Sequence, residues 1–115
     1  FFFFFFFFFS LLEPEFRPNL RHAYGTFAAG RDNNPGKLSA GCQFYVVHAA
    51  DGIPRLDDNY TIYGHVFKGM DVVDAIVTVE TDEADEPLTM IELDVNIIEI
   101  SRTAIESSGF TIPSE

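Results

Sequence analysis

The sequence predicts a mainly β fold, built as an antiparallel sheet with one or two short helices. Three short segments are rich in aromatic and β-branched residues and are bounded by turn formers, which is typical of strands. A fourth segment alternates apolar and polar residues, which predicts an antiparallel strand with one wet face. The expected order is three strands, a helix and a fourth strand, joined by long loops, and this order favours an antiparallel sheet over a βαβ architecture. With 115 residues the chain falls in the range of one small domain.

The strands are expected after an extended approach segment at residues 10–19. They are placed, in chain order, at residues 25–30, 43–48, 60–67 and 91–101. The second of these, QFYVVH, is the clearest, and its near-continuous apolarity suggests that both faces are covered or line a pocket. Gly64 in the third strand marks a bulge or the close approach of another backbone. The last strand alternates cleanly until Ile98 breaks the pattern.

Two helices are expected in the second half of the chain. In residues 69–76, Met70, Val73 and Ile76 recur at helical spacing, which predicts a helix of about two turns. Residues 102–107 are expected to form a second short helix that ends at Gly109. An inventory of four strands leaves sheet edges that must be covered or paired.

The chain begins with nine Phe residues, which we exclude from the fold prediction. A helix that spans a bilayer needs about 20 apolar residues, and this run is shorter. The run also lacks the positive charge and the small-residue cleavage site of a signal peptide. We interpret it as an artefact or a low-complexity segment and not as a membrane anchor.

The charge balance argues against two classes of partner. The net charge is −11, from 18 acidic and 7 basic residues, whereas contacts to nucleic acid or to an anionic membrane need clustered Lys and Arg. The acids concentrate in residues 80–86, ETDEADE, which reads as a solvated loop. A calcium site is the alternative, but the segment lacks the alternating Asp and Asn ligands and the central Gly of an EF-hand loop.

Other site chemistry finds little support in the sequence. The single cysteine, Cys42, excludes an intrachain disulfide and reads as a small half-buried residue more readily than as a catalytic thiol. His22, His48 and His65 are widely spaced and read as surface or partly satisfied histidines, not as metal ligands. Ser39 does not lie in a nucleophile elbow, and no phosphate-binding glycine loop occurs, so no cofactor is expected.

Three blocks of sequence carry a family resemblance. HAYGTFAAGRDNNP is followed by GCQFYVVH and then by RLDDNYTIYGHVFKGMDVVDAI. In this order and at this spacing they resemble the cyclophilin family, over residues 22–77, with residues 91–101 as the closing strand. The tail ISRTAIESSGFTIP is similar to C-terminal extensions of some bacterial members.

The resemblance implies both a fold and an activity. It implies a partial cyclophilin-like antiparallel β-barrel at residues 10–101, truncated at its upstream side, with a helical tail at residues 102–115. The implied activity is cis–trans isomerisation of X–Pro bonds, which assists protein folding. The implied partners are proline-containing peptides or unfolded protein clients, and the implied state is a monomer without a cofactor. A cytoplasmic location is favoured over a periplasmic one without being decided.

The resemblance also assigns roles to residues of the second and third blocks. Gln43 matches the family's Gln, which holds the substrate backbone and helps to place the catalytic cation. Tyr45 stands where the family usually has Phe, in a wall of the proline pocket, and Leu56 matches the pocket Leu. Each has a plainer reading: Leu56 as a core residue and Tyr45 as a cross-strand packing aromatic. Gln43 discriminates best, because a buried Gln that opens an apolar strand is otherwise costly.

The rim of the implied pocket departs from the family pattern. Tyr60 occupies the position of the pocket His, and Arg55 that of a Trp found in many members. Gly30 and Arg31 stand where an Ala-Asn pair usually binds the substrate backbone. These differences predict a changed specificity or rate with the same fold.

The catalytic Arg of the family lies upstream of the His22 block. Arg17 and Arg21 are too close to that block to be carried over as its counterpart. We therefore expect the chain to be the C-terminal part of such an isomerase, with reduced or no turnover. The alternative is a non-catalytic module that binds proline peptides.

Overall fold

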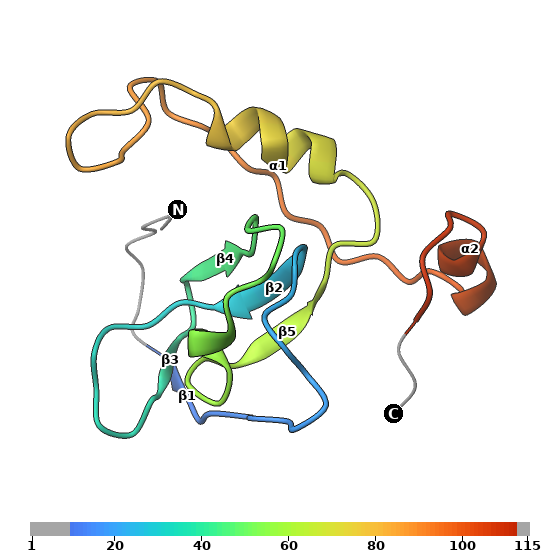
Figure 1. The fold of residues 1–115 in the computed structure, drawn as a ribbon, viewed down its shortest axis with the longest axis horizontal. Coiled ribbons are helices and arrows are strands. Elements are labelled where there is room, and N and C mark those ends of the chain that lie inside the picture. Colours follow the sequence, from blue (N-terminus) through green and yellow to red (C-terminus); the bar gives the residue numbers. More distant parts are fainter. Residues whose placement is uncertain (1–9, 113–115) are drawn as a thin grey trace. The chain divides into compact units, whose positions relative to one another are not determined.

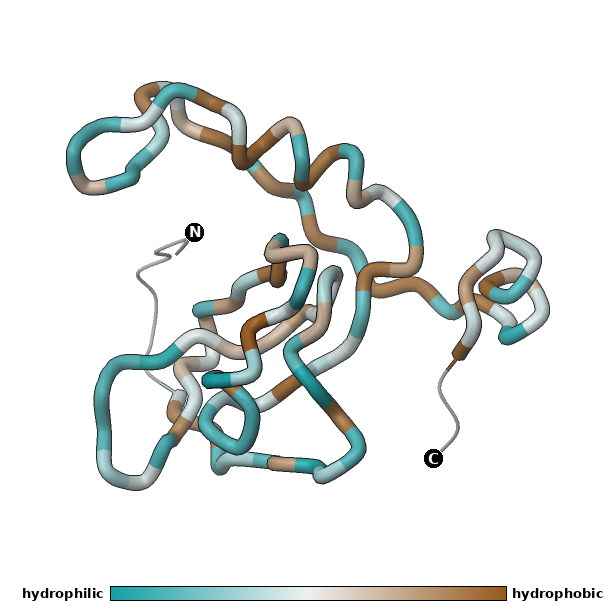
Figure 2. The backbone as a smooth tube through the Cα atoms, viewed as in Figure 1, coloured by the Kyte–Doolittle hydropathy of each residue, from teal (hydrophilic) through white to brown (hydrophobic). Residues whose placement is uncertain are grey.

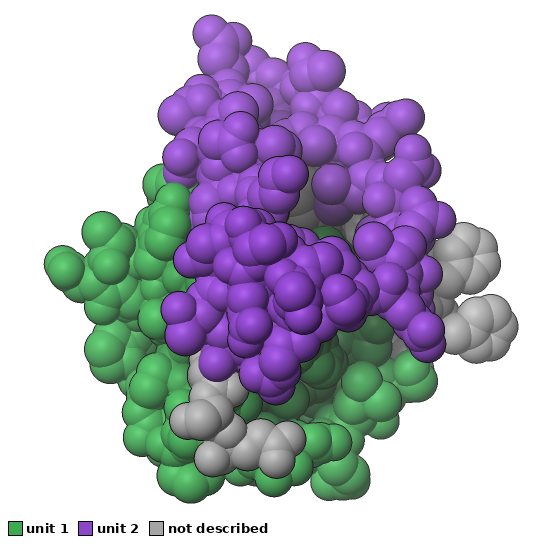
Figure 3. Space-filling view, turned by 90° about the vertical axis from the view of Figure 1, so that its right-hand side faces the viewer, with its two compact units in different colours: residues 1–66 green, residues 67–115 purple. Residues whose placement is uncertain are grey.

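The computed structural model describes residues 10–112, and Figure 1 shows the order of its strands and helices. The chain divides into two compact units, the first ending at Val66 and the second beginning at Phe67 (Figure 3). Among the described residues, the strands lie in the first unit and the α-helices in the second. The N-terminal Phe run lies outside the described residues.

A three-stranded antiparallel sheet forms the centre of the first unit. Strand β2 (Thr26–Ala29) pairs on one side with β4 (Phe44–Val46) and on the other with β5 (Ile62–His65). Small side chains suit the central strand, where Ala28 and Ala29 are 0% and 1% exposed. These strands lie within the first three segments predicted from composition, so those predictions are confirmed.

A bulge interrupts the pairing of β2 with β5. Phe27 is opposite Gly64, whereas Ala28 is opposite Ile62, so Tyr63 is the extra residue on β5. The sequence predicted either a bulge or a close backbone approach at Gly64. The structure has the bulge, and a Cβ at Gly64 would meet no atom within 4 Å.

Three aromatic rings gather on one face of this sheet. The ring of Phe27 lies 5.1 Å from that of Phe44 and 5.9 Å from that of Tyr63, measured between centroids. Side chains alternate between the two faces of a strand. Tyr45, the neighbour of Phe44 on β4, therefore belongs to the opposite face.

Two very short strands form a second antiparallel sheet that the sequence pattern did not predict. Strand β1 (Leu11–Leu12) lies in the expected approach segment and pairs with β3 (Ser39–Ala40). The Ala40 N–H donates to the Gly30 carbonyl at 3.0 Å, so β3 is tied to the chain just after β2. Strands of two residues are too short for any periodicity to reveal them.

The second unit contains the two predicted helices. Helix α1 (Met70–Val77) starts after Gly69, whose φ of 99° suits a residue without a side chain. Helix α2 (Arg102–Glu106) starts at Ser101, whose hydroxyl accepts a hydrogen bond from the Ala104 N–H at 3.2 Å. Neither helix contains a buried residue.

The predicted strand at residues 91–101 is wrong. Residues 91–101 adopt no strand, although Figure 2 shows apolar residues along this stretch. Ile97 is 99% exposed, and Val95 and Ile98 are 79% and 75% exposed. An alternating segment becomes a strand only where its backbone finds a partner, and no segment within residues 10–112 pairs with this one.

The acidic segment at residues 80–86 is an exposed loop, as the charge pattern predicted. Asp82 organises it, because one carboxylate oxygen accepts hydrogen bonds from the backbone N–H groups of Ala84 at 2.8 Å and Glu86 at 3.0 Å. Side chains of this kind commonly close a turn in this way.

The observed architecture is small and mixed. Within residues 10–112, its sheets are antiparallel and it has two short α-helices, as predicted, but its strand content is modest where a mainly β chain was expected. No helix within the described range is long and apolar enough to span a membrane.

Candidate functional site

Three of the predicted site residues contact one another. Tyr45 on β4 and Tyr60, which precedes β5, meet edge to face, with ring centroids 5.9 Å apart and planes at 82°. The Arg31 guanidinium carbon lies 4.5 Å from the centre of the Tyr60 ring, a cation–π contact. Arg31 Nε also donates to the Asn59 carbonyl at 3.2 Å. The fold thus joins side chains from three separate segments into one cluster.

Gly30 and Gln43 lie side by side where β2 ends and β4 begins. The Gly30 N–H donates to the Gln43 carbonyl at 2.8 Å, and a Cβ on Gly30 would lie 2.8 Å from the Gln43 Cβ. This close approach needs a glycine. Gln43 is half-buried and stands two residues before Tyr45, and Gly30 directly precedes Arg31. Gly30 and Gln43 are therefore each close in the chain to a member of the aromatic cluster.

One tight turn carries the remaining predicted site residues. Arg55 and Leu56 belong to η1 (Pro54–Leu56), a single turn of 3₁₀-helix. The Leu56 carbonyl accepts the Tyr60 N–H at 3.1 Å, so half-buried Leu56 and Tyr60 belong to one hydrogen-bonded turn. Arg55 is exposed, and its carbonyl accepts a hydrogen bond from the Asn59 side chain at 3.2 Å.

The Tyr45 hydroxyl lies in an unusual environment. It is buried and has no hydrogen-bond partner within the described part of the chain. Burial raises the pKa of the Tyr45 phenol well above its ordinary value, and Tyr60 adds to the rise. The positive charges of Arg31 and Arg55 oppose this rise in pKa.

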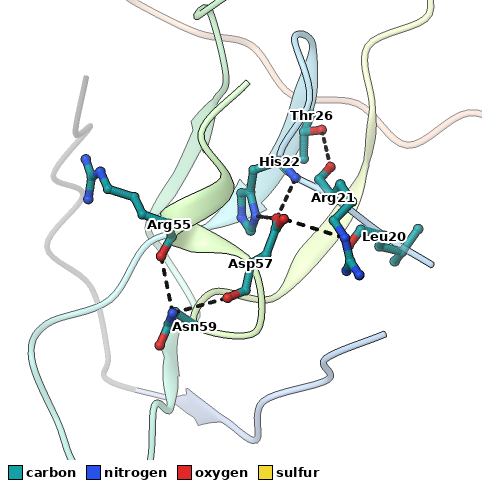
Figure 4. Close-up of polar contacts among 7 residues, drawn as sticks. All are labelled: Leu20, Arg21, His22, Thr26, Arg55, Asp57 and Asn59. Atoms are coloured by element: carbon teal, nitrogen blue, oxygen red, sulfur yellow. Dashed lines mark hydrogen bonds and ion pairs between the residues drawn. The ribbon is translucent and has the colours of Figure 1, made fainter. Parts of the chain in front are cut away.

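A hydrogen-bonded pair, His22 and Asp57, lies beside the cluster, and Figure 4 shows it in detail. One carboxylate oxygen of Asp57 accepts the His22 backbone N–H at 2.8 Å and lies 2.8 Å from Nδ1 of the His22 ring. The other oxygen lies 3.6 Å from Nε of Arg21. The His22 ring stacks on Tyr45, with centroids 6.0 Å apart and planes at 15°.

The electrostatics of Asp57 follow from these contacts. Burial raises the pKa of its carboxyl, but the two hydrogen bonds from His22 and the charge of Arg21 outweigh burial. The net result is a pKa below the ordinary value of 3.8. Asp57 is therefore ionised at neutral pH.

Sequence reasoning missed the His22–Asp57 pair. His22 was read as a surface or partly satisfied histidine. Its side chain is fully buried. Its hydrogen-bonding capacity is partly satisfied, because Nδ1 contacts Asp57 whereas Nε2 has no partner in the described range. No periodicity links two residues that are 35 positions apart. The available signal was that both residues stand inside the blocks that carry the family resemblance.

The other side chains considered from the sequence lie apart from the cluster. His48 and His65 are exposed, and Cys42 is half-buried, as predicted for it. Within residues 10–112, no three His, Cys, Asp or Glu side chains group as metal ligands would. The binding and catalytic roles of the predicted site residues stay predictions.

Comparison with known proteins decides the family. A family model described as cyclophilin-type peptidyl-prolyl cis–trans isomerase/CLD matches residues 9–98. The chain belongs to the cyclophilin family. This match includes the cluster, the turn of η1 and the His22–Asp57 pair, so every predicted site residue lies in cyclophilin-type sequence.

Curated cyclophilins resemble the chain over most of its length. Peptidyl-prolyl cis-trans isomerase CYP71 of Arabidopsis thaliana is 38% identical over 89 residues, covering 77% of this chain and 13% of the relative. CYP18-2 of the same plant is 31% identical over 84 residues, covering 73% and 49%. Peptidyl-prolyl cis-trans isomerase-like 1 of Neurospora crassa is 35% identical over 82 residues, covering 70% and 47%. The chain thus spans less than half the length of these relatives.

Proposed function

We propose that this protein binds proline-containing segments of peptides or unfolded proteins and takes part in X–Pro isomerisation during protein folding. The observation that carries the proposal is the contact of Tyr45, Tyr60 and Arg31 within sequence of the cyclophilin family. Rings from two segments with a half-buried Leu56 nearby offer the apolar surface that a proline ring needs.

Isomerisation of an X–Pro bond does not require the enzyme to form a covalent bond with the substrate. The barrier to rotation is about 18–20 kcal/mol because the amide is stabilised by resonance. An enzyme lowers the barrier by binding the twisted amide more tightly than either planar form. Hydrogen-bond donors and cations near the prolyl nitrogen weaken the resonance further.

We assign the predicted residues to roles on this basis. Tyr45, Leu56 and Tyr60 form the wall and floor of the proline pocket. Gln43 fixes the substrate backbone and helps to place the catalytic cation. The rim of the site is formed by Gly30, Arg31 and Arg55.

The chain of residues 1–115 is proposed to bind with reduced or no turnover. The catalytic Arg of the family has no counterpart that can be carried over, and Arg17 and Arg21 are engaged with Glu15 and Asp57. A non-catalytic proline-binding module is the second candidate, favoured by this engagement of both arginines. We further propose that residues 10–101 form part of a cyclophilin-like barrel with a helical tail at 102–115, and that the chain is a monomer.

One experiment separates the two candidates. A protease-coupled isomerisation assay on a proline tetrapeptide is run beside a binding titration of the same peptide and the same protein. We expect binding with little turnover, and weaker binding for Leu56→Ala. Leu88→Ala serves as the control, because Leu88 is 64% exposed and lies in the other unit. Absence of binding by the unmodified chain would contradict the proposed function, and robust turnover would contradict the non-catalytic candidate.

A further inference from the structure

The turn that carries Leu56 and Tyr60 is fastened at two points to His22, a residue outside it. At the start of the turn, the Ile53 N–H donates to the His22 carbonyl at 2.7 Å. In its middle, the Asp57 carboxylate accepts the His22 N–H at 2.8 Å and contacts the His22 ring (Figure 4). Gly52 permits this approach, because a Cβ there would lie 2.5 Å from the His22 carbonyl oxygen. The backbone N–H and the backbone carbonyl of His22 therefore both hold the turn.

The chemistry of the Asp57–His22 contact is defined by the carboxylate. An ionised carboxylate only accepts hydrogen bonds, so Nδ1 of His22 carries the hydrogen in this contact. The side chain of His22 is 0% exposed and that of Asp57 is 15% exposed. A charge this far removed from water persists only where hydrogen bonds and opposite charge compensate it, and His22 and Arg21 supply both.

The contact reaches the candidate site by two routes. The His22 ring, oriented by Asp57, stacks on Tyr45. On the other route, the Asp57 carbonyl accepts a hydrogen bond from the Asn59 side chain at 3.1 Å, and the Asn59 carbonyl accepts from Arg31 at 3.2 Å. Asp57 thus acts on both walls of the aromatic cluster without belonging to it.

We propose that Asp57 is a positioning residue of the proline site. Through His22 it fixes the η1 turn against β4, so that Leu56 and Tyr60 face Tyr45. The binding consequence of this proposal rests on the proposed function. The structural consequence, the contact of the two tyrosine rings, does not.

The test uses two substitutions at Asp57 and one matched control in the full chain. Asp57→Ala removes the contacts of the carboxylate with His22 and Arg21 and leaves the Asp57 backbone carbonyl in place, whereas Asp57→Asn keeps one acceptor oxygen while it removes the charge. Asp58→Asn removes the same charge at the adjacent, exposed position. Asp58 has a φ of 56°, a left-handed conformation that Asn accepts well, so the control keeps its backbone.

Two properties of the folded protein are measured. Nuclear Overhauser contacts between the Tyr45 and Tyr60 rings report the position of the turn, and a titration with a proline tetrapeptide gives the affinity. We expect Asp57→Ala to lose the ring contact and to bind about 10- to 100-fold more weakly, as small misplacements of a site do. We expect Asp57→Asn to lie between Asp57→Ala and the unmodified chain. Asp58→Asn should keep the contact and change affinity by less than about twofold.

The outcomes separate this proposal from the proposed function. If Asp57→Ala does not fold, Asp57→Asn supplies both readouts. Retention of the ring contact in the folded Asp57 variants would overturn the positioning role. An equal loss of affinity in Asp58→Asn would overturn it as well, because charge alone would then explain the effect. If the unmodified chain binds no peptide, the proposed function fails, and the ring contact still decides the role of Asp57.

Discussion

Replacing Gly30 by Ala tests the closest backbone approach in the candidate site. The added Cβ would lie 2.8 Å from the Gln43 Cβ and 3.3 Å from the Gln43 carbonyl carbon. Real Cβ atoms do not approach each other this closely, and the opposing atoms belong to the base of a side chain and to the backbone. The Gly30–Gln43 hydrogen bond at 2.8 Å holds the two segments together, so relief requires a shift of β4.

The expected cost follows from two opposing effects. Overpacking of this kind costs about 1–3 kcal/mol. Replacing Gly by Ala also stabilises by about 0.4–1 kcal/mol, because the unfolded chain loses freedom. We therefore expect a net loss of about 1–2 kcal/mol in the free energy of opening the β2–β4 pair.

The matched control is Gly64→Ala on β5. A Cβ there meets nothing within 4 Å, so only the favourable effect on the unfolded chain remains. Amide hydrogen exchange in β2 and β4 measures local opening directly. We expect exchange in Gly30→Ala to be faster by about 5- to 30-fold than in the unmodified chain. Exchange in Gly64→Ala should be unchanged or slower. Equal exchange rates in the two variants would refute the reasoning.

Three further predictions concern the same molecule. Tyr45→Phe removes a buried hydroxyl without a partner in the described range, so it should slow exchange in β4 by stabilising the sheet about 1 kcal/mol; faster exchange would show that the hydroxyl is bonded. The pKa of Asp57 is lowered on folding, so its stabilising contribution is complete above its unfolded value and is lost as the pH falls through the folded value. Acid unfolding of the first unit should therefore set in below about pH 4 and be less steep in Asp57→Asn, and an identical acid limb would contradict this. The exposed apolar side chains of residues 88–100 should bind a hydrophobic dye and make the protein poorly soluble and its unfolding incompletely cooperative, whereas a sharp two-state transition without dye binding would contradict that expectation.

The elements predicted correctly are those whose signal is local. Consecutive aromatic and β-branched residues predict strand β4, and apolar residues at helical spacing predict helix α1. In both cases the residues that decide the structure are neighbours in the chain. Gly30, Arg31 and Tyr60 were chosen through the family resemblance and not through a local pattern, and their roles stay predictions.

The errors arise where structure depends on a distant partner. Residues 91–101 have the alternation of a strand, but alternation describes side chains, and a strand also requires a second backbone to satisfy its N–H and C=O groups. The β1–β3 pair has the partner but is too short to show a pattern. The His22–Asp57 contact joins residues that only the fold brings together. None of these features is encoded within a single window of sequence.

The alternation of Phe44 and Tyr45 along β4 has a consequence for how the protein can change. The rings of Phe27, Phe44 and Tyr63 hold the sheet together from one side, while Tyr45 meets His22 and Tyr60 on the other. Substitutions in the first group are therefore expected to change thermal stability and to leave the proposed ligand-binding group on the other face intact. In this small sheet, we expect the free energy of unfolding and the proposed ligand specificity to depend on opposite faces.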